Sequence, residues 1–570
     1  MAGSAIVIGS GPAGSITAWA LAQAGWEVIV LERGRNLRPG FGEVPSSELG
    51  TLYSSDEVKS TRAFGFPDPL LEPMTGRTQS EAEEGQARSA QGQVVNMGAA
   101  VGGTALHYNA KFPRFWRQDF TQLSDLGPVA GAQVADWPIR YEDLAPFYDE
   151  VEAQIGVQGD VAQMPDFVLA QAPRSGDFVM PPNPTNYAAK LLAEGARRLG
   201  FAPFPYPAAV NSTDFDGRPR CNSCGLCSGF GCPINARGDG LVSYLNPAVR
   251  SGRVRVIPRA LAYRIETDAS GRRARAVHYY DAQHRSHSLS ADKILLAGSP
   301  IQTARLLLLS ASAAHPNGLG NRSDQVGRNL MFHNFIIGGA LFERDVQSLR
   351  GQSTTLEFDD LVGPFTGPEV QALGLPYLKG ALVQLGSGLP LLSEAYTYAG
   401  FSAQSFGAVH KNLMRLSPMR RRVAGLQFVG EDLPQAANRV DLDPDVRDWH
   451  GLPSPRVTYA PHAHEKAGSL YFGPQLEALC LAAPGAIGAA ILPNPLLSDA
   501  APSTFHQAGT ARMGNDPETS VCNADGRLHE VDNVHVVDGS TFPTFPGFNP
   551  TLTILANALR ISRRIAAGQA

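Results

Sequence analysis

The chain is poor in charge and in cysteine. Only 18% of its 570 residues are Asp, Glu, Lys or Arg, and the formal net charge is −5, without long runs of either sign. A nucleic-acid-binding protein normally carries a basic excess or stripe, so the composition argues against that class. Six cysteines are too few for a disulfide-stapled secreted scaffold. Hydrophobic residues, at 43%, are too abundant for a disordered chain, so we expect a folded protein with a large core.

A membrane span and a targeting signal are also missing from the pattern. The long apolar stretch at residues 478–497 contains Pro484, Pro493 and Pro495, which would break a helix in lipid. We interpret it as a helix end, a turn and a strand, and we predict no membrane span. No basic or twin-arginine segment precedes the first apolar residues. We therefore predict a cytoplasmic protein, unless it is exported together with a partner that carries the signal.

The first residues match a dinucleotide-binding unit. An apolar strand at residues 5–8 leads into the glycine motif of Gly9, Gly11 and Gly14, then a helical pattern and a second strand that ends in Glu32. In such a unit the first glycine permits a tight turn, the second lets the backbone approach a pyrophosphate, and the third lets helix and strand pack closely. The helix N-terminus offers free N–H groups to phosphate. The acidic residue suits a ribose hydroxyl and disfavours NADP, but the motif does not separate FAD from NAD.

Candidate chemistry lies at the far end of the chain. His506 is a plausible base for a substrate hydroxyl, because an imidazole titrates close to neutral pH. Asn549 could hold the same oxygen, and it precedes Pro550, which suits the first position of a final helix that runs to about residue 567. That helix N-terminus favours the negative charge of a reduced flavin. The alternative for His506 is a satisfied polar group in the core.

Four of the six cysteines share one short segment. Cys221, Cys224, Cys227 and Cys232 are spaced C-x2-C-x2-C-x4-C and are followed by proline. Four thiolates this close in sequence can surround one metal centre, and the spacing is near that of bacterial ferredoxins. The residues leave four interpretations open: an iron–sulfur cluster, structural zinc with four thiolates, one or two disulfides, or free thiols in a tight turn.

Two local expectations concern polar segments. Residues 79–93 are polar, small and charged, which predicts a loop that could act as a lid. His462 and His464 form an i, i+2 pair, which we place on a solvated edge rather than at a metal site.

Together these motifs resemble the glucose–methanol–choline (GMC) family of flavin oxidoreductases. Further segments that carry the resemblance are Asn96–Thr104, Asp136–Leu144, Ala297–Ser310 and Val326–Met331. The resemblance implies bound FAD and an α/β fold, in which a Rossmann-like FAD-binding domain holds an inserted antiparallel-sheet substrate domain. We expect the discontinuous FAD-binding domain at residues 1–160, 201–330 and 500–570, and the substrate domain at 161–200 and 331–499.

The resemblance also assigns site residues. The family's catalytic histidine falls on His506, and its second catalytic position falls on Asn549, a His–Asn pair like that of the pyranose oxidase, gluconate dehydrogenase and sugar dehydrogenase branch. His107 matches a position that bonds FAD covalently in some members and lies beside a non-covalent flavin in others. The implied cofactor-binding positions are Gly9, Gly11, Gly14, Glu32, Gly102, Gly103, His107, Asn109, Asp538, Gly539, Pro550 and Thr551.

The predicted activity is oxidation of an alcohol group of a sugar, glycoside or polyol by an FAD-dependent dehydrogenase or oxidase. In this hypothesis His506 takes the hydroxyl proton as hydride moves to flavin N5, and Asn549 orients the oxygen. One alternative is a sterol or long-chain alcohol oxidase that uses O₂. Another is a flavin electron-transfer subunit without its own substrate. Family members with an iron–sulfur cluster pass electrons to a cytochrome, so an electron-acceptor protein or small subunit is a candidate partner.

Overall fold

The glycine-rich N-terminus forms the strand–turn–helix–strand unit that the sequence predicts. β1 (Ser4–Ile8) leads through the glycine turn into α1 (Pro12–Gln23) and β2 (Glu27–Glu32). The structure is a computed structural model that describes every residue except 1–2, 37–66, 226, 228–230, 233, 349, 387–406, 418–420, 493–500 and 503. α1 begins at a proline, which suits a first helical position because its missing N–H would have no partner there.

A parallel five-stranded sheet gathers distant parts of the chain. β1 lies between β2 and β10 (Lys293–Leu296), and its residues from 5 to 8 are buried, as expected of a strand covered on both faces. β6 (Val254–Pro258) and β20 (Val534–Val536) complete the order β20-β10-β1-β2-β6. Strands from three distant parts of the chain, β6, β10 and β20, therefore all join the dinucleotide-binding sheet.

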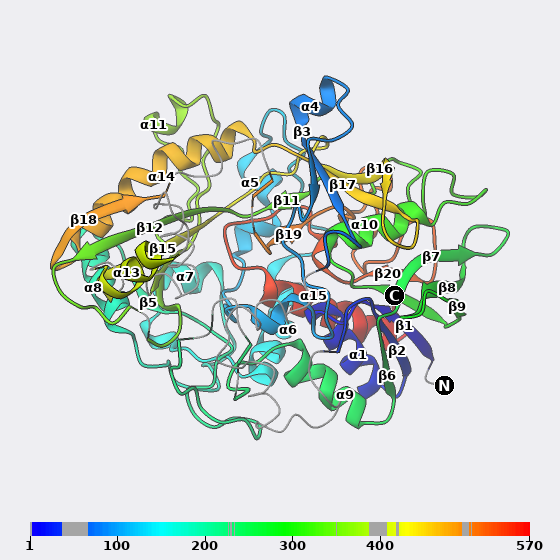
Figure 1. Ribbon diagram of the computed structural model, residues 1–570, viewed down its shortest axis with the longest axis horizontal. Helices are drawn as coiled ribbons and strands as arrows, with labels where there is room; N and C mark the ends of the chain where they lie inside the picture. The colour runs from blue at the N-terminus through cyan, green and yellow to red at the C-terminus, as the bar shows by residue number, and fades with distance from the viewer. Residues whose placement is uncertain are drawn as a thin grey trace.

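The two ends of the chain pack against each other beside this sheet. α15 (Thr551–Ala566) lies along α1, and the Ser562 hydroxyl donates a hydrogen bond to the Thr17 hydroxyl at 3.2 Å. One face of α15 is apolar and buried, and Arg563 and Arg564 in its last turn complement the helix dipole. Figure 1 shows α15 and α1 adjacent, with both termini on the same side of the molecule.

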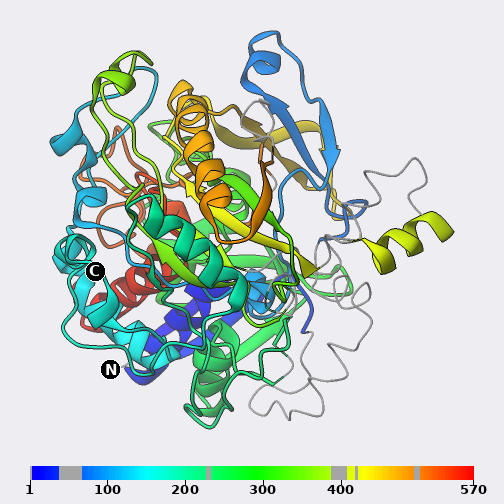
Figure 2. The same cartoon turned by 90° about the vertical axis from the view of Figure 1, so that its left-hand side faces the viewer.

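A six-stranded antiparallel sheet occupies the opposite side of the molecule (Figure 1). Helices α8 (Tyr187–Arg198) and α14 (Ala463–Ala482) cover one of its faces, and Figure 2 shows them in front of the strands. The sheet confirms the antiparallel layer expected beside the FAD-binding fold, whereas the residue boundaries of the two domains remain a prediction. In sheet order the strands are β18 (Ala486–Ile491), β12 (Asn334–Phe342), β15 (Val423–Gly430), β14 (Val383–Gly386), β13 (Thr354–Phe358) and β5 (Phe204–Pro205).

Smaller elements complete the described chain. A four-stranded sheet joins β16 (Arg439–Arg447), β17 (Pro453–Tyr459), β3 (Met74–Thr78) and β4 (Ala90–Gly92), and a three-stranded sheet joins β7 (Leu261–Thr267), β8 (Ala274–Tyr280) and β9 (Ser286–Leu289). A two-stranded pair joins β11 (Met331–Phe332) and β19 (Gln507–Ala508). The remaining helices and helical turns are α4 (Gln79–Glu83), η1 (Gly103–His107), η2 (Arg117–Phe120), α5 (Gln122–Leu126), α6 (Tyr141–Ile155), η3 (Val161–Gln163), α7 (Asp166–Gln171), η4 (Leu241–Leu245), α9 (Asn246–Arg250), α10 (Pro300–Leu309), α11 (Pro368–Gln371), α13 (Ala408–Leu416) and η7 (Gly539–Thr541).

Two local expectations differ from the structure. The polar segment 79–93, expected as a loop, begins with the short helix α4 and ends in β4, which pairs with β3. A capping box starts α4, because the Thr78 hydroxyl accepts the Glu81 N–H and the Glu81 carboxylate accepts the Thr78 N–H. His464, expected on a solvated edge, is buried in α14, where its Nε2 accepts the backbone N–H of Lys379.

The apolar stretch near the end of α14 has the predicted form. α14 ends at Ala482, a turn follows, and β18 runs over Ala486–Ile491, while residues 493–497 lie outside the described chain. Across the ranges that the structure describes, no helix combines the length and the apolar character needed to cross a membrane.

Candidate active site

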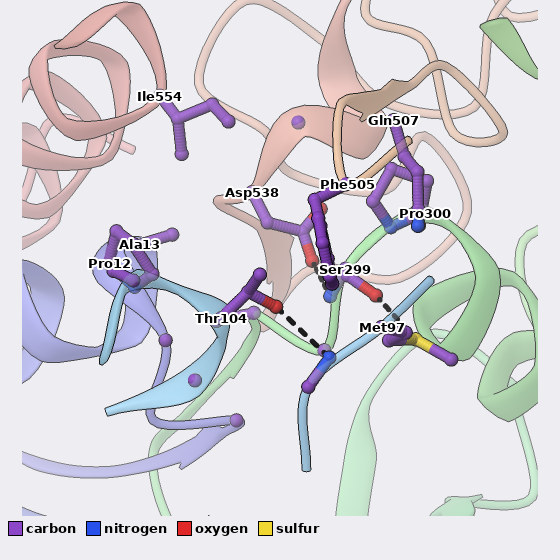
Figure 3. A pocket seen from close by; sticks show the side chains of 18 of the residues that line it. Pro12, Ala13, Met97, Thr104, Ser299, Pro300, Phe505, Gln507, Asp538 and Ile554 are labelled. Atoms are coloured by element: carbon purple, nitrogen blue, oxygen red, sulfur yellow. Dashed lines mark hydrogen bonds between the residues drawn. The ribbon is translucent and has the colours of Figure 1, made fainter. Parts of the chain in front are cut away.

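A cavity of about 500 Å³ lies between the glycine turn of the parallel sheet and the antiparallel sheet. Figure 3 shows side chains from distant segments around one hollow, among them Pro12 from α1, Thr104 from η1, Ser299 before α10, and Asp538 near the C-terminus. Of the residues predicted from sequence to bind the cofactor or act in catalysis, twelve line this cavity: Gly9, Gly11, Glu32, Gly103, His107, Asn109, His506, Asp538, Gly539, Asn549, Pro550 and Thr551.

The glycine turns shape one end of the cavity. A Cβ on Gly11 would meet no protein atom within 4 Å, so the space beside it is open for a phosphate group. Gly103 has φ +63°, and its Cβ would lie 2.7 Å from Cα of Gly11, so two backbone segments meet there without side chains. Gly14 and Gly102 do not line the cavity. A Cβ on Gly14 would lie 2.0 Å from the Gly9 carbonyl oxygen, which agrees with a packing role for that glycine.

Glu32 holds the glycine turn as well as facing the cavity. Its Oε2 accepts hydrogen bonds from the Ser10 backbone N–H at 3.0 Å and from the Ser10 hydroxyl at 2.7 Å, and its Oε1 accepts the Gly34 N–H at 2.7 Å. Ser10 in turn accepts the Gly102 N–H at 3.1 Å. A carboxylate has about four acceptor positions, so one remains for a ribose hydroxyl. The sequence motif did not indicate the bridging role of Ser10.

Asp538 joins the C-terminal segment to the start of α10. Its Oδ2 accepts the Ser299 N–H and the Thr303 hydroxyl, each at 2.8 Å, and its Oδ1 accepts the Ser540 N–H at 2.9 Å. Burial raises the pKa of this carboxyl, and the hydrogen bonds oppose that rise. Gly539 follows Asp538 at the cavity wall, so the turn that we predict to bind the flavin lines the cavity.

His107 and Asn109 lie on the segment that continues from η1 along the cavity. Burial, together with the positive charge of Arg237, lowers the pKa of His107 to about 4. The His107 ring contacts the Phe505 ring edge-on, with centroids 5.0 Å apart. The side-chain oxygen of Asn109 is buried in the cavity wall and has no hydrogen-bond partner in the described part of the chain. A buried acceptor without a partner is costly, so this atom fits a bound group that donates a hydrogen bond, such as a flavin ring N–H.

His506 lies immediately before β19, with its ring in the cavity wall. Its Nδ1 is 2.9 Å from Nδ1 of His333, a residue that lies between β11 and β12. Burial lowers the pKa of His506 to about 3, and the nearby positive charge of Lys111 contributes to the shift. The imidazole is therefore neutral near pH 7 and has a lone pair with which it can accept a proton.

Asn549 reaches the same cavity from the start of α15. Its Oδ1 accepts two hydrogen bonds, one from the Tyr206 hydroxyl at 2.7 Å and one from Nε2 of Gln384 at 2.6 Å. In the ranges that the structure describes, Nδ2 of Asn549 donates to no protein acceptor, so this nitrogen remains for a ligand in the cavity. His506 and Asn549 together place a proton acceptor and a hydrogen-bond donor on the wall of one cavity.

Comparison with known protein families identifies the family of this chain. Models of the GMC oxidoreductase family match residues 5–335 for the N-terminal part and 434–558 for the C-terminal part. The chain belongs to the GMC oxidoreductase family. Membership confirms the family, the fold class, the enzyme class and the FAD cofactor predicted from sequence.

Individual relatives support the same assignment, and a solved structure shows the same fold. The fructose dehydrogenase large subunit of Gluconobacter japonicus is 30% identical, with 98% of this chain and 97% of that protein covered. The 6'''-hydroxyparomomycin C oxidase of Streptomyces lividus is also 30% identical, with 98% and 90% covered. The crystal structure of a formate oxidase aligns with a TM-score of 0.65 and 13% identity over 100% of this chain and 99% of that chain, which shows the shared fold.

The four clustered cysteines of this GMC chain lie on a segment that Arg237 connects to η1. The Arg237 guanidinium donates to the Cys227 carbonyl at 2.9 Å and to the Leu106 carbonyl at 2.6 Å, so it connects the cysteine segment with η1. All four thiols are free, and burial raises the pKa of Cys227 to about 12. Among the residues that the structure describes, no three Cys, His, Asp or Glu side chains are gathered closely enough to hold a metal ion. The four thiols therefore do not form a ligand set in this arrangement.

Four further residues around the GMC site had no signal in the sequence. Lys111, Tyr206, His333 and Gln384 lie near His506 or Asn549, yet they come from four separate segments. None of them stands in a motif with characteristic spacing. The fold alone brings them together.

Proposed function

We propose that this chain oxidises an alcohol group of a sugar, glycoside or polyol. The observation that carries the proposal is that neutral His506 and the Asn549 amide lie on the wall of the cavity that the dinucleotide-binding turn enters. Bound FAD supplies the hydride acceptor for such a reaction. Asn109, His107 and the N-terminus of α15 are the residues that we propose lie beside its flavin ring, and Gly9, Gly11 and Glu32 beside its pyrophosphate and ribose.

The two catalytic side chains have complementary tasks. His506 takes the hydroxyl proton, while the electron pair of the C–H bond leaves the same carbon as hydride and the carbonyl product forms. Asn549 donates a hydrogen bond to the substrate oxygen and holds it within reach of the imidazole. Because burial keeps His506 neutral, the base is ready without first losing a proton.

The sugar class is supported by the names of the relatives and by the chemistry of the cavity wall. The relatives include a fructose dehydrogenase large subunit, a gluconate 2-dehydrogenase flavoprotein and a paromamine 6'-oxidase. Beyond His506 the cavity wall includes Phe335, Gln427 and Lys111, which together offer an aromatic face and polar groups. A sugar ring has both apolar C–H faces and hydroxyl groups, so this wall suits it better than a wholly apolar sterol.

An anaerobic substrate panel tests the proposal. Purified holoenzyme is mixed without oxygen with ketoses, aldoses, aldonates, polyols, glycosides, a sterol and a long-chain alcohol, and bleaching of the flavin absorption is followed. We expect at least one sugar, glycoside or polyol to reduce the flavin faster than the sterol or the long-chain alcohol. Reduction by the sterol or long-chain alcohol alone would support the sterol-oxidase alternative, and no bleaching by any alcohol would support a non-catalytic electron-transfer subunit.

A second proposal concerns the clustered cysteines. We propose that Cys221, Cys224, Cys227 and Cys232 would hold an iron–sulfur cluster if their thiols moved closer together than they lie in this structure. Such a cluster would supply a route for electrons to an acceptor protein or small subunit. Their spacing and the Arg237 connection to η1 support this. The measurement is iron, zinc and acid-labile sulfide per polypeptide in protein purified without oxygen. Iron and sulfide together are the expected result, while zinc alone or neither metal would contradict it.

A further inference from the structure

The hydrogen bonds around His506 determine which ring nitrogen carries its proton. The Pro546 carbonyl lies 2.9 Å from Nε2 of His333 and can only accept, so Nε2 of His333 must carry a hydrogen. Burial lowers the pKa of His333 well below its ordinary value, so this ring is neutral and its Nδ1 has no hydrogen. The hydrogen in the 2.9 Å contact between the two Nδ1 atoms therefore belongs to His506. Nε2 of His506 therefore carries no hydrogen and presents a lone pair.

We propose that His333 is a positioning residue that holds His506 in the tautomer whose Nε2 accepts the substrate proton. The proposal rests on the proposed alcohol oxidation, because it concerns the base of that reaction. His333 is itself held on two sides: its ring stacks on Phe545, with centroids 3.8 Å apart and planes 9° apart, and it donates to the Pro546 carbonyl. A fixed acceptor of this kind prevents the His506 ring from turning its N–H toward the substrate.

Two variants of similar size separate orientation from packing at His333. His333→Gln keeps an acceptor for His506 and a donor for Pro546, whereas His333→Met fills the same space with neither. We expect the methionine variant to reduce its flavin at least about tenfold more slowly than the glutamine variant, because the base loses its orienting partner. Substrate affinity should change less than the reduction rate, since His333 lies behind the base. The measurement is anaerobic stopped-flow flavin reduction with a substrate that bleaches the wild-type flavin.

The results distinguish a failure of the proposed role of His333 from a failure of the proposed function. Equal reduction rates in the glutamine and methionine variants would overturn the role of His333, even though the wild type turns over substrate. A wild type that no alcohol reduces would instead contradict the proposed function. If the methionine variant does not retain flavin, His333→Ala with and without added imidazole makes the same comparison. Restored reduction with imidazole supports the proposal, and an unchanged rate contradicts it.

A separate set of hydrogen bonds determines which way the Asn549 amide faces. Lys111, as an ammonium, can only donate, and it donates to Oε1 of Gln384. Nε2 of Gln384 therefore points away from Lys111 and donates to Oδ1 of Asn549 at 2.6 Å. The Tyr206 hydroxyl donates to the same oxygen at 2.7 Å. Because charged Lys111 can only donate, it fixes which group donates and which accepts in each of the following hydrogen bonds. Nδ2 of Asn549 is then the amide atom that faces the cavity.

From this chain of bonds we infer that Lys111 and Gln384 are positioning residues for the Asn549 amide. Both are buried, and Gln384 does not line the cavity, so it acts on the substrate oxygen through Asn549. Lys111 also lines the cavity wall, and it acts on the amide by fixing the orientation of Gln384. Without them the amide could present its oxygen to the substrate, and an oxygen cannot donate to the hydroxyl oxygen whose proton His506 removes. This second inference also rests on the proposed alcohol oxidation, but it does not depend on the role of His333.

Gln384→Glu tests the inference with almost no change in shape. A carboxylate still accepts from Lys111 but cannot donate to Asn549, so the amide turns its nitrogen toward the new carboxylate. At about pH 6, where carboxylates ionise and Lys111 with its pKa of about 7 is mostly charged, we expect flavin reduction to slow by about 10²-fold. Tyr206→Phe removes the other donor but leaves Gln384 in place, so it should cost much less.

A double variant distinguishes orientation from general damage to the site. In an Asn549→Ala background the amide is gone, so Gln384→Glu should add little further loss if it acts through Asn549. Full additivity of the two losses would overturn the inference. So would a Gln384→Glu enzyme that reduces its flavin at the wild-type rate. The flavin spectrum and the thermal midpoint of each variant show whether the fold and the cofactor are retained.

Discussion

Replacing His506 by alanine is expected to slow substrate-driven flavin reduction by about 10²- to 10⁴-fold while FAD remains bound. The imidazole of His506 lies on the cavity wall and is neutral, and we propose that it accepts the substrate proton. Without that base, the hydroxyl proton must leave to water in a buried site, which is unfavourable. FAD should stay bound, because the glycine turn, Glu32 and the Asp538 turn that we assign to the cofactor are untouched.

Anaerobic stopped-flow reduction at saturating substrate measures the loss in His506→Ala, and flavin absorption per polypeptide measures occupancy. His287→Ala is the matched control, since His287 is an exposed histidine that pairs with Asp281 far from the cavity. The control should reduce its flavin as fast as the wild type. Unchanged reduction kinetics in His506→Ala would show that the imidazole takes no part in the reaction.

Replacing Gly11 by valine is expected to weaken FAD binding by at least about tenfold, or ~1.4 kcal/mol, without loss of folded protein. Gly11 has φ −64°, so a larger residue can adopt its backbone conformation. A Cβ there would meet no protein atom within 4 Å, and the protein itself therefore does not resist the substitution. The added side chain would instead occupy the space through which the backbone approaches the pyrophosphate.

For Gly11→Val, FAD affinity and the thermal stability of the protein are measured together, because this separates a loss of FAD binding from a loss of folded protein. FAD is removed, the apoprotein is titrated with FAD, and the thermal midpoint is recorded with and without cofactor. Gly176→Val is the control, because Gly176 is an exposed glycine whose Cβ would also meet nothing within 4 Å. The two apoproteins should melt alike, and the Gly11 variant should gain less stability from FAD. Equal FAD affinity in both variants would mean that Gly11 does not face the pyrophosphate.

The parts of the fold that depend on local sequence were predictable. The strand, glycine motif, helix and strand before Glu32 are consecutive, so their pattern is visible in about thirty residues. That His506 and Asn549 line one cavity was also expected, but only because the resemblance to a known family assigns both to one site. The helix α4 was missed although its signal, a threonine followed three residues later by Glu81, stands in the sequence.

The residues behind the catalytic pair could not have been found from the sequence. Gln384 lies in a central strand of the antiparallel sheet and Tyr206 follows its edge strand, while Lys111 and His333 come from two other segments. An isolated glutamine or lysine in a sequence gives no sign of the acceptor that it will face. Their roles depend on contacts between residues far apart in the chain, which only the folded arrangement supplies. The buried position of His464 was missed for the same reason.

The packing of α15 on α1 has a consequence for how the cofactor site assembles. Gly9 and Gly11 line one part of the cavity, and Thr551 and Ile554 of α15 line another, although these segments lie far apart in the sequence. The cavity is therefore complete only after the two segments have packed together. We expect that a chain truncated before α15 would purify without the yellow colour of a bound flavin.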